Sequence, residues 1–90
     1  MASQSKKHQN FVNSTIYGLP ISTVPGIGSV TEKYFIEKGI DTAEKLLGQF
    51  LILGRNEILF KQYLSTFACD QGQQTVIFQA LNDWSRQFIS

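Results

Sequence analysis

Residues 24–30 read Val-Pro-Gly-Ile-Gly-Ser-Val, where two glycines flank one isoleucine and a helix-like run follows at once. Gly26 and Gly28 predict a tight turn with unusual backbone angles, and they let main-chain N–H groups approach a ligand closely. The first N–H groups of the following helix have no acceptor within it, and the positive end of its dipole lies there as well. This spacing predicts a backbone site for an anion such as phosphate.

The same stretch has a second interpretation, in which the hairpin only packs two helices together. The flanking sequence favours the anion site. Residues 21–24 predict one short helical turn closed by Pro25, a second helix runs over 29–39 to a capping glycine, and Ile27 is placed to plug the core between them. This is a helix-hairpin-helix motif at about residues 20–38. Because its donors are backbone groups, the predicted ligand is duplex DNA of any sequence.

The elements that position the hairpin read as helices. Ahead of it, residues 3–13 predict a short helix or arm held by Phe11 and Val12, and Gly18 with Pro20 predicts a connection. In the motif itself, the residues expected to face inward or to share one helix face are Ile21, Val24, Val30, Tyr34 and Phe35.

Three further helices are predicted behind the hairpin. Asp41 can cap a helix that Gly54 ends, Asn56 can cap the next one, and a loop at 69–73 precedes the last. No strand pattern occurs, so we expect a single all-α domain over 1–90, a compact bundle of about five helices plus a short helical turn. Its predicted apolar positions from residue 46 onward are Leu46, Leu47, Phe50, Leu51, Leu53, Leu59, Phe60, Tyr63, Leu64, Phe67, Val76, Ile77, Ala80, Leu81, Trp84 and Phe88.

Composition limits the function further. Eight Lys and Arg against seven Asp and Glu give a net charge of +1, so any anion site is local rather than part of a broad basic field. Cys69 is the one cysteine, which excludes an internal disulfide and a cysteine-rich zinc site; we expect it to be a buried thiol in a reducing compartment. The N-terminal residues lack an apolar signal core, and no window resembles a membrane span, so we expect an intracellular, soluble protein.

Catalysis is not predicted. Some DNA glycosylases hold DNA with this motif, but they also need a base pocket and a catalytic carboxylate or lysine, for which 90 residues leave no room. Paired carboxylates, an activated nucleophile and a phosphate-binding loop are missing from the sequence. His8 could in principle bind a metal or act as a base, but we expect a surface residue that helps to hold the arm. Trp84 and Phe88 are expected in the core, and no cofactor or metal is expected.

The chain as a whole resembles the barrier-to-autointegration factor family, small chromatin proteins of animal nuclei. The stretches that carry the resemblance are KHQNFV at 7–12, GIG at 26–28, KGIDTAEKLLGQFLIL at 38–53, NEILFKQYL at 56–64 and CDQGQQTVIFQALNDWSRQFI at 69–89. The resemblance implies a homodimer that cross-bridges duplex DNA without sequence preference. It also implies LEM-domain proteins of the inner nuclear membrane, lamins and histones as partners, and a nuclear protein with some cytoplasmic pool.

The resemblance also assigns residues. The DNA-contacting positions are Lys7, Gly26, Ile27, Gly28 and Val30, with Lys33 as a neighbouring charge. The dimer and partner interface comprises Gly48, Ile52, Leu53, Leu59 and Tyr63, which periodicity alone would equally place in the core. Gly48 costs about 1 kcal/mol inside a helix, and the close approach of another helix would explain it. Ser3 and Ser5 are the expected phosphorylation sites, where added negative charge would oppose phosphate binding.

Departures from the family leave a second function open, and at two positions a cation is missing. Tyr34 stands where the family has a second lysine, and Thr75 stands where it has an arginine. Gly54 and Arg55 replace a lysine pair. Since each lost phosphate contact removes roughly one unit of salt dependence, DNA binding could be weakened. The alternative is an interaction protein of the same fold that pairs with a DNA-competent relative or binds LEM-domain partners.

Overall fold

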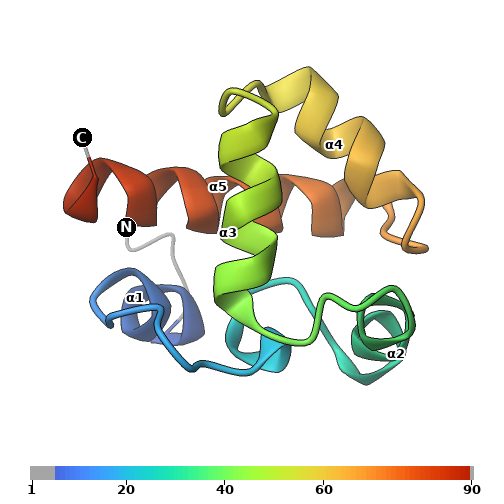
Figure 1. The fold of residues 1–90 in the computed structure, drawn as a ribbon, viewed down its shortest axis with the longest axis horizontal. Helices are drawn as coiled ribbons and strands as arrows, with labels where there is room; N and C mark the ends of the chain where they lie inside the picture. Colours follow the sequence, from blue (N-terminus) through green and yellow to red (C-terminus); the bar gives the residue numbers. More distant parts are fainter. Residues whose placement is uncertain (1–5, 90) are drawn as a thin grey trace.

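The computed structural model describes residues 6–89, and every regular element within them is helical (Figure 1). An isolated antiparallel bridge joins Pro20 to Thr42. The all-α class is confirmed, with five helices and one short helical turn over the described residues. The elements are α1 Lys6–Val12, η1 Ile21–Thr23, α2 Ser29–Glu37, α3 Ala43–Ile52, α4 Glu57–Ser65 and α5 Gln71–Phe88.

The longest helix, α5, runs through the structure and is crossed by α3, with α4 on one side and α1 and α2 on the other (Figure 1). Aromatic rings fill the space between these helices. Phe35 stacks on Phe67 with ring centroids 4.1 Å apart, and Phe50 meets Phe60 edge to face at 5.1 Å. None of the helices described in residues 6–89 is long and apolar enough to cross a membrane.

The helix ends follow local chemistry, with two corrections. The Asn56 side chain accepts from the Leu59 N–H, as predicted. The N-cap of α3 is Thr42 rather than Asp41, because the Asp41 carboxylate instead accepts from Lys45 Nζ at 2.8 Å, and this hydrogen bond lowers its pKa. The loop predicted at 69–73 is also wrong, since Asp70 caps α5 in a reciprocal capping box with its third residue.

Glycines end two helices as predicted. Gly39 and Gly54 have φ values of +83° and +71°, a left-handed conformation that favours glycine after a helix. Each stops its helix without a side chain that would strain the turn.

Six predicted apolar positions point outward instead, among them Leu51 and Leu59 on α3 and α4, which are 38% and 46% exposed. Val30 and Tyr34 are 65% and 44% exposed, because α2 packs through the line of Thr31 and Phe35. On α5, Val76 is 42% exposed and Phe88 is 43% exposed in the last turn. The inward prediction holds for Ile21, Val24, Phe35, Ile77, Ala80, Leu81 and Trp84, all of which are buried.

The segment that enters the hairpin is tied to the start of α3. The Ile21 N–H donates to the Asp41 carbonyl at 3.0 Å, and the Ala43 N–H donates to the Leu19 carbonyl at 2.9 Å. These backbone bonds flank the bridge between Pro20 and Thr42. They fix the hairpin entry against a helix about 20 residues further along the chain.

Candidate functional site

The hairpin is a tight backbone turn between η1 and α2. The Ile27 N–H donates to the Val24 carbonyl at 3.1 Å, and Gly26 between them has φ +93°. Ile27 is 2% exposed and belongs to the core cluster, so the predicted plug is confirmed. The structure places this turn between η1 Ile21–Thr23 and α2 Ser29–Glu37, within the residues 20–38 for which a helix-hairpin-helix is predicted.

The two hairpin glycines are glycines for different reasons. A Cβ on Gly26 would lie 2.8 Å from Ile77 Cγ1 and 3.2 Å from the Gln73 carbonyl oxygen, so no side chain fits there. Gly28 has an ordinary φ of −98°, and a Cβ on it would meet nothing within 4 Å. The predicted unusual backbone angle is wrong for Gly28, where glycine leaves an open surface instead.

The start of α2 is exposed and has no side-chain cap. Gly28 is the N-cap residue, and the first intrahelical bond runs from the Glu32 N–H to the Gly28 carbonyl at 2.8 Å. The N–H groups of residues 29–31 consequently have no acceptor within α2. Gly28, Ser29 and Val30 are all exposed, so the N–H groups at this end of the helix dipole lie at the surface.

A lysine from α1 reaches the same place. Lys7 Nζ donates to the Ile27 carbonyl at 3.4 Å, across 20 positions of sequence. Lys33 is exposed one turn after Val30 on α2 and lines a shallow hollow with Val30, Tyr34 and Glu37. Of the two predicted cations, Lys7 therefore lies at the hairpin itself, and Lys33 lies beside an acidic residue.

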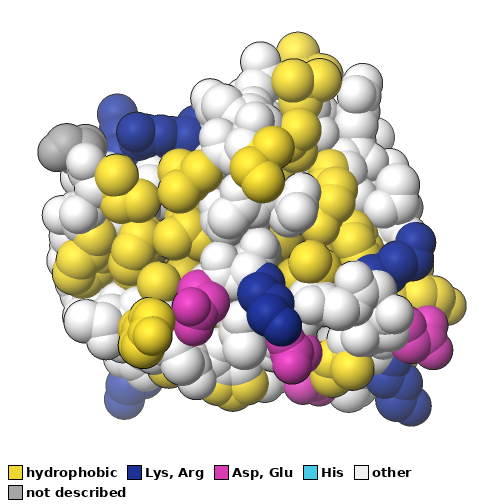
Figure 2. All heavy atoms as spheres, in the orientation of Figure 1, with side chains coloured by type: hydrophobic (Ala, Val, Ile, Leu, Met, Phe, Trp, Pro, Cys, Tyr) yellow, Lys and Arg dark blue, Asp and Glu magenta, His cyan; other side chains and the backbone are white. Residues whose placement is uncertain are grey.

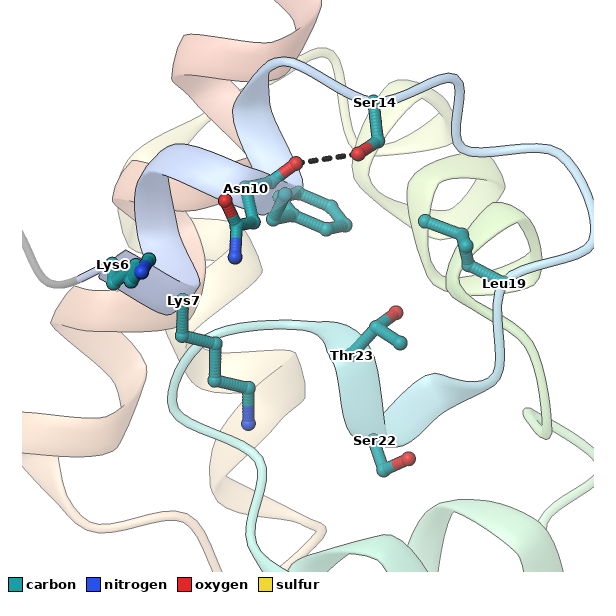
Figure 3. Close-up of a pocket in the computed structure, with 8 residues that line it drawn as sticks. Lys6, Lys7, Asn10, Ser14, Leu19, Ser22 and Thr23 are labelled. Carbon is teal, nitrogen blue, oxygen red and sulfur yellow. Dashed lines mark hydrogen bonds between the residues drawn. The ribbon is translucent and has the colours of Figure 1, made fainter.

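A larger hollow of about 520 Å³ lies between α1 and η1. Figure 3 shows the Asn10 amide and the Lys7 side chain extending from α1 toward the open space that Ser22 and Thr23 border from the other side. The Ser14 and Thr23 hydroxyls donate to the Asn10 and Pro20 carbonyls. The charged residues that line this hollow are Lys6 and Lys7. Two ammonium groups without a carboxylate among the lining residues suit an anion.

Gln73 is a site residue that the sequence analysis missed. Its Nε2 donates to the Gly26 carbonyl at 3.3 Å and to Thr31 Oγ1 at 3.0 Å, joining α5 to both sides of the hairpin. Its Oε1 accepts from the Asp70 N–H at 3.0 Å. The spacing of Asp70 and Gln73 is a capping-box signal, but it gives no indication of the contact with Gly26.

His8 is buried rather than on the surface. It is 6% exposed, and its Nε2 lies 3.0 Å from Asp83 Oδ2 on α5. The expectation of a surface residue is wrong because the partner lies 75 positions away in sequence, while the expected role in holding the arm is consistent with this contact. Among the described residues, no group of three or more His, Cys, Asp or Glu side chains could hold a metal ion.

The predicted interface residues lie on α3, α4 and the turn between them. Ile52 and Leu59 are 75% and 46% exposed, and a Cβ on Gly48 would meet nothing within 4 Å. Leu53 and Tyr63 are partly buried against the core. Figure 2 shows apolar side chains gathered over α3 and its junction with α4. The exposed apolar residues there, which we call the aliphatic face, are Leu51, Ile52, Ile58 and Leu59.

Four other residues named in the sequence analysis have separate outcomes. Cys69 is a buried free thiol, as predicted, and burial together with the neighbouring Asp70 raises its pKa to about 11. The Thr75 hydroxyl donates to the Gln71 carbonyl of its own helix at 3.0 Å. Ser3 and Ser5 lie outside the described residues.

Fold and site together define a small all-α protein with a tight hairpin between η1 and α2, after which α2 begins exposed and without a side-chain cap. The family model described as barrier to autointegration factor matches residues 2–88. Barrier-to-autointegration factors of Danio rerio and Drosophila melanogaster are 37% and 31% identical over 90 residues, covering 99% of this chain and 100% of each relative. The Homo sapiens protein of that name is 36% identical over 86 residues, covering 94% of this chain and 97% of the relative. The chain therefore belongs to the barrier-to-autointegration factor family.

Proposed function

We propose that this protein binds double-stranded DNA through its sugar-phosphate backbone, without preference for base sequence. One observation carries the proposal: the uncapped, exposed start of α2 lies beside the Lys7 ammonium, which is 3.4 Å from the Ile27 carbonyl. Phosphate oxygens readily accept hydrogen bonds from the free N–H groups at a helix start and from a lysine ammonium. Because these groups contact the DNA backbone, they carry no base information.

The open surface at Gly28 supports the same ligand. Nothing within the described residues fills the space beside its Cα, and its φ allows any residue, so neither packing nor backbone angle requires glycine. The close approach of a bulky ligand to the backbone would require it. Val30 and Lys33, both exposed further along α2, complete the proposed contact surface.

The same site provides a direct test. A labelled random duplex of about two helical turns is titrated across salt with the wild type, Gly28→Glu and the matched neutral variant Gly28→Gln. Both variants place a side chain in open space, so both are expected to fold. We expect Gly28→Glu to weaken binding by roughly 10- to 100-fold, the value of losing one or two charge-assisted hydrogen bonds. Gly28→Gln should also weaken it, because its side chain hinders the close approach of DNA, but by a smaller factor, because it adds no charge that repels phosphate. Equal binding by all three proteins would refute the proposal.

We propose further that the protein is a homodimer that bridges two duplexes. The aliphatic face and the open position at Gly48 support this, since contiguous exposed apolar residues are typical of interaction sites. Leu53 and Tyr63 would back this interface from the partly buried side. Membership of the family supports a chromatin protein in the nucleus, with some cytoplasmic pool, that links DNA to LEM-domain proteins, lamins and histones. Phosphorylation of Ser3 and Ser5 would release the DNA, and a Ser5→Glu variant with unchanged duplex affinity would contradict that part.

A second candidate function rests on missing cations. Tyr34 is exposed on α2 where a lysine would add a phosphate contact, Thr75 bonds to its own helix, and Glu37 offsets Lys33. These features favour a protein of the same fold with weakened DNA binding that acts by pairing with a DNA-competent relative or by binding LEM-domain partners. Tyr34→Lys distinguishes the two functions. A gain of about tenfold in a weak wild-type affinity would favour the second.

A further inference from the structure

We propose that His8 and Asp83 are positioning residues for DNA binding, which hold α1 so that the Lys7 ammonium and the N–H groups of α2 act on one phosphate. The inference rests on the function proposed above and names residues that contact no DNA themselves. It depends on how α1 is held and on which residue of α1 faces the hairpin.

The first observation is that α1 has only seven residues. A helix of that length is not stable by itself in water, so its place and rotation must come from tertiary contacts. Phe11 supplies apolar contact, being 3% exposed within the core cluster. Apolar contact is not directional, and by itself it leaves the rotation of a short helix weakly determined.

The second observation is where the directional contacts lie. Beyond the end of α1, Trp84 Nε1 donates to the Ser14 carbonyl at 2.8 Å, and Gln87 Nε2 donates to Asn13 Oδ1 at 3.2 Å. At the start of α1, His8 Nε2 lies 3.0 Å from Asp83 Oδ2 on α5. Adjacent helix residues are fixed together in rotation, so this contact also determines where Lys7 points.

The third observation is the direction of the neighbouring residue. His8 is turned into the protein against α5, whereas Lys7 is exposed and its Nζ lies 3.4 Å from the Ile27 carbonyl. The hydrogen bond to Asp83 requires one orientation of the His8 ring, whereas an apolar side chain at this position would not be held in one orientation. The pair therefore acts on DNA through Lys7.

The test is a double-mutant cycle on duplex affinity. His8→Leu and Asp83→Ala each remove the pair, Lys7→Ala removes the cation, and His8→Gln keeps a donor near the Nε2 position as the conservative control. We expect each loss variant to weaken binding about as much as Lys7→Ala, roughly 5- to 10-fold, and to lower the salt slope by about one unit. His8→Gln should retain most of the affinity. In the Lys7→Ala background, removing the His8–Asp83 pair should weaken duplex binding by a further factor of less than about two.

Each outcome decides the matter. Equal weakening by His8→Leu with and without Lys7 would mean a global effect on the fold and would overturn the inference, as would unchanged binding by Asp83→Ala. Should His8→Leu fail to fold, the cycle is carried by Asp83→Ala, whose side chain is 27% exposed. If Gly28→Glu and Lys7→Ala both leave binding unchanged, the proposed function is wrong and the inference is wrong with it. If Gly28→Glu alone weakens binding, only the inference fails.

Discussion

Gly26 lies directly against Ile77 of α5, so closely that a Cβ on the glycine would come within 2.8 Å of the Ile77 side chain. The hairpin and the longest helix are thus packed backbone against side chain at this point. Gly26 also has φ +93°, which side chains rarely adopt.

Gly26→Ala should therefore lower the free energy of unfolding by about 1 to 3 kcal/mol, through backbone strain and overpacking against α5. Gly28→Ala is the matched control and should change it by less than about 0.5 kcal/mol, because its Cβ would lie in open space. Chemical denaturation of the two variants measures the difference. Equal destabilisation would contradict the packing described for the hairpin.

A carboxylate in the hollow between α1 and η1 should weaken DNA binding. Asn10→Asp places it beside Lys6 and Lys7, where it competes with phosphate for both ammonium groups. We expect roughly a tenfold loss of duplex affinity and a smaller salt slope. Gln9→Glu, on the same helix but outside the hollow, makes the same change in charge. An equal loss in both variants would indicate a general effect of net charge, and the hollow would then have no part in binding.

Breaking the aliphatic face should separate bridging from binding. Ile52 is 75% exposed, so Ile52→Glu costs the monomer little but places a charge in the proposed dimer interface. We expect the molar mass, measured by light scattering, to fall from that of a dimer to that of a monomer. A single duplex should still bind, while capture of a second duplex should be lost. Gln62→Glu, an exposed position on α4, is the control. A dimeric Ile52→Glu protein would contradict the proposed interface.

Cys69 should make the fold sensitive to alkaline pH. Burial raises the pKa of its thiol to about 11, so the unfolded chain loses this proton first as the pH rises through 9. Below pH 9 the Cys69 thiol is protonated in both the folded and the unfolded chain, so it contributes nothing to the pH dependence of the free energy of unfolding. Between pH 9 and 11 the free energy of unfolding should fall by about 2 kcal/mol through this group. Denaturation of the wild type and Cys69→Ala across this range measures it, and parallel pH profiles would refute the shift.

Local patterns in the sequence predicted much of the fold. The caps at Asn56, Gly39 and Gly54, the plug at Ile27 and the number of helices all depend on residues within a few positions of each other. Short-range sequence spacing carries that information directly. The same holds for the hairpin, whose turn and following helix are consecutive in the chain.

The errors arose where distant contacts overrode local preference. His8 looks like a surface residue until Asp83 is brought beside it, and nothing in the local sequence indicates that the Gln73 amide contacts Gly26. Thr31 is buried in place of Val30 because its hydroxyl accepts from that same amide. In each case a polar side chain pairs with a residue far away in the sequence, across the contact between α5 and α1 or the hairpin, and periodicity of apolar residues does not detect such pairs.

The backbone hydrogen bonds between residues 19–21 and 41–43 hold the hairpin entry rigidly against the start of α3. The aliphatic face begins at the far end of that same helix, about ten residues beyond these bonds. A partner bound to the aliphatic face would therefore contact the C-terminal end of α3, while the N-terminal end of α3 is bonded to the hairpin entry. A rigid α3 would then fix the orientation of the proposed DNA site relative to the bound partner.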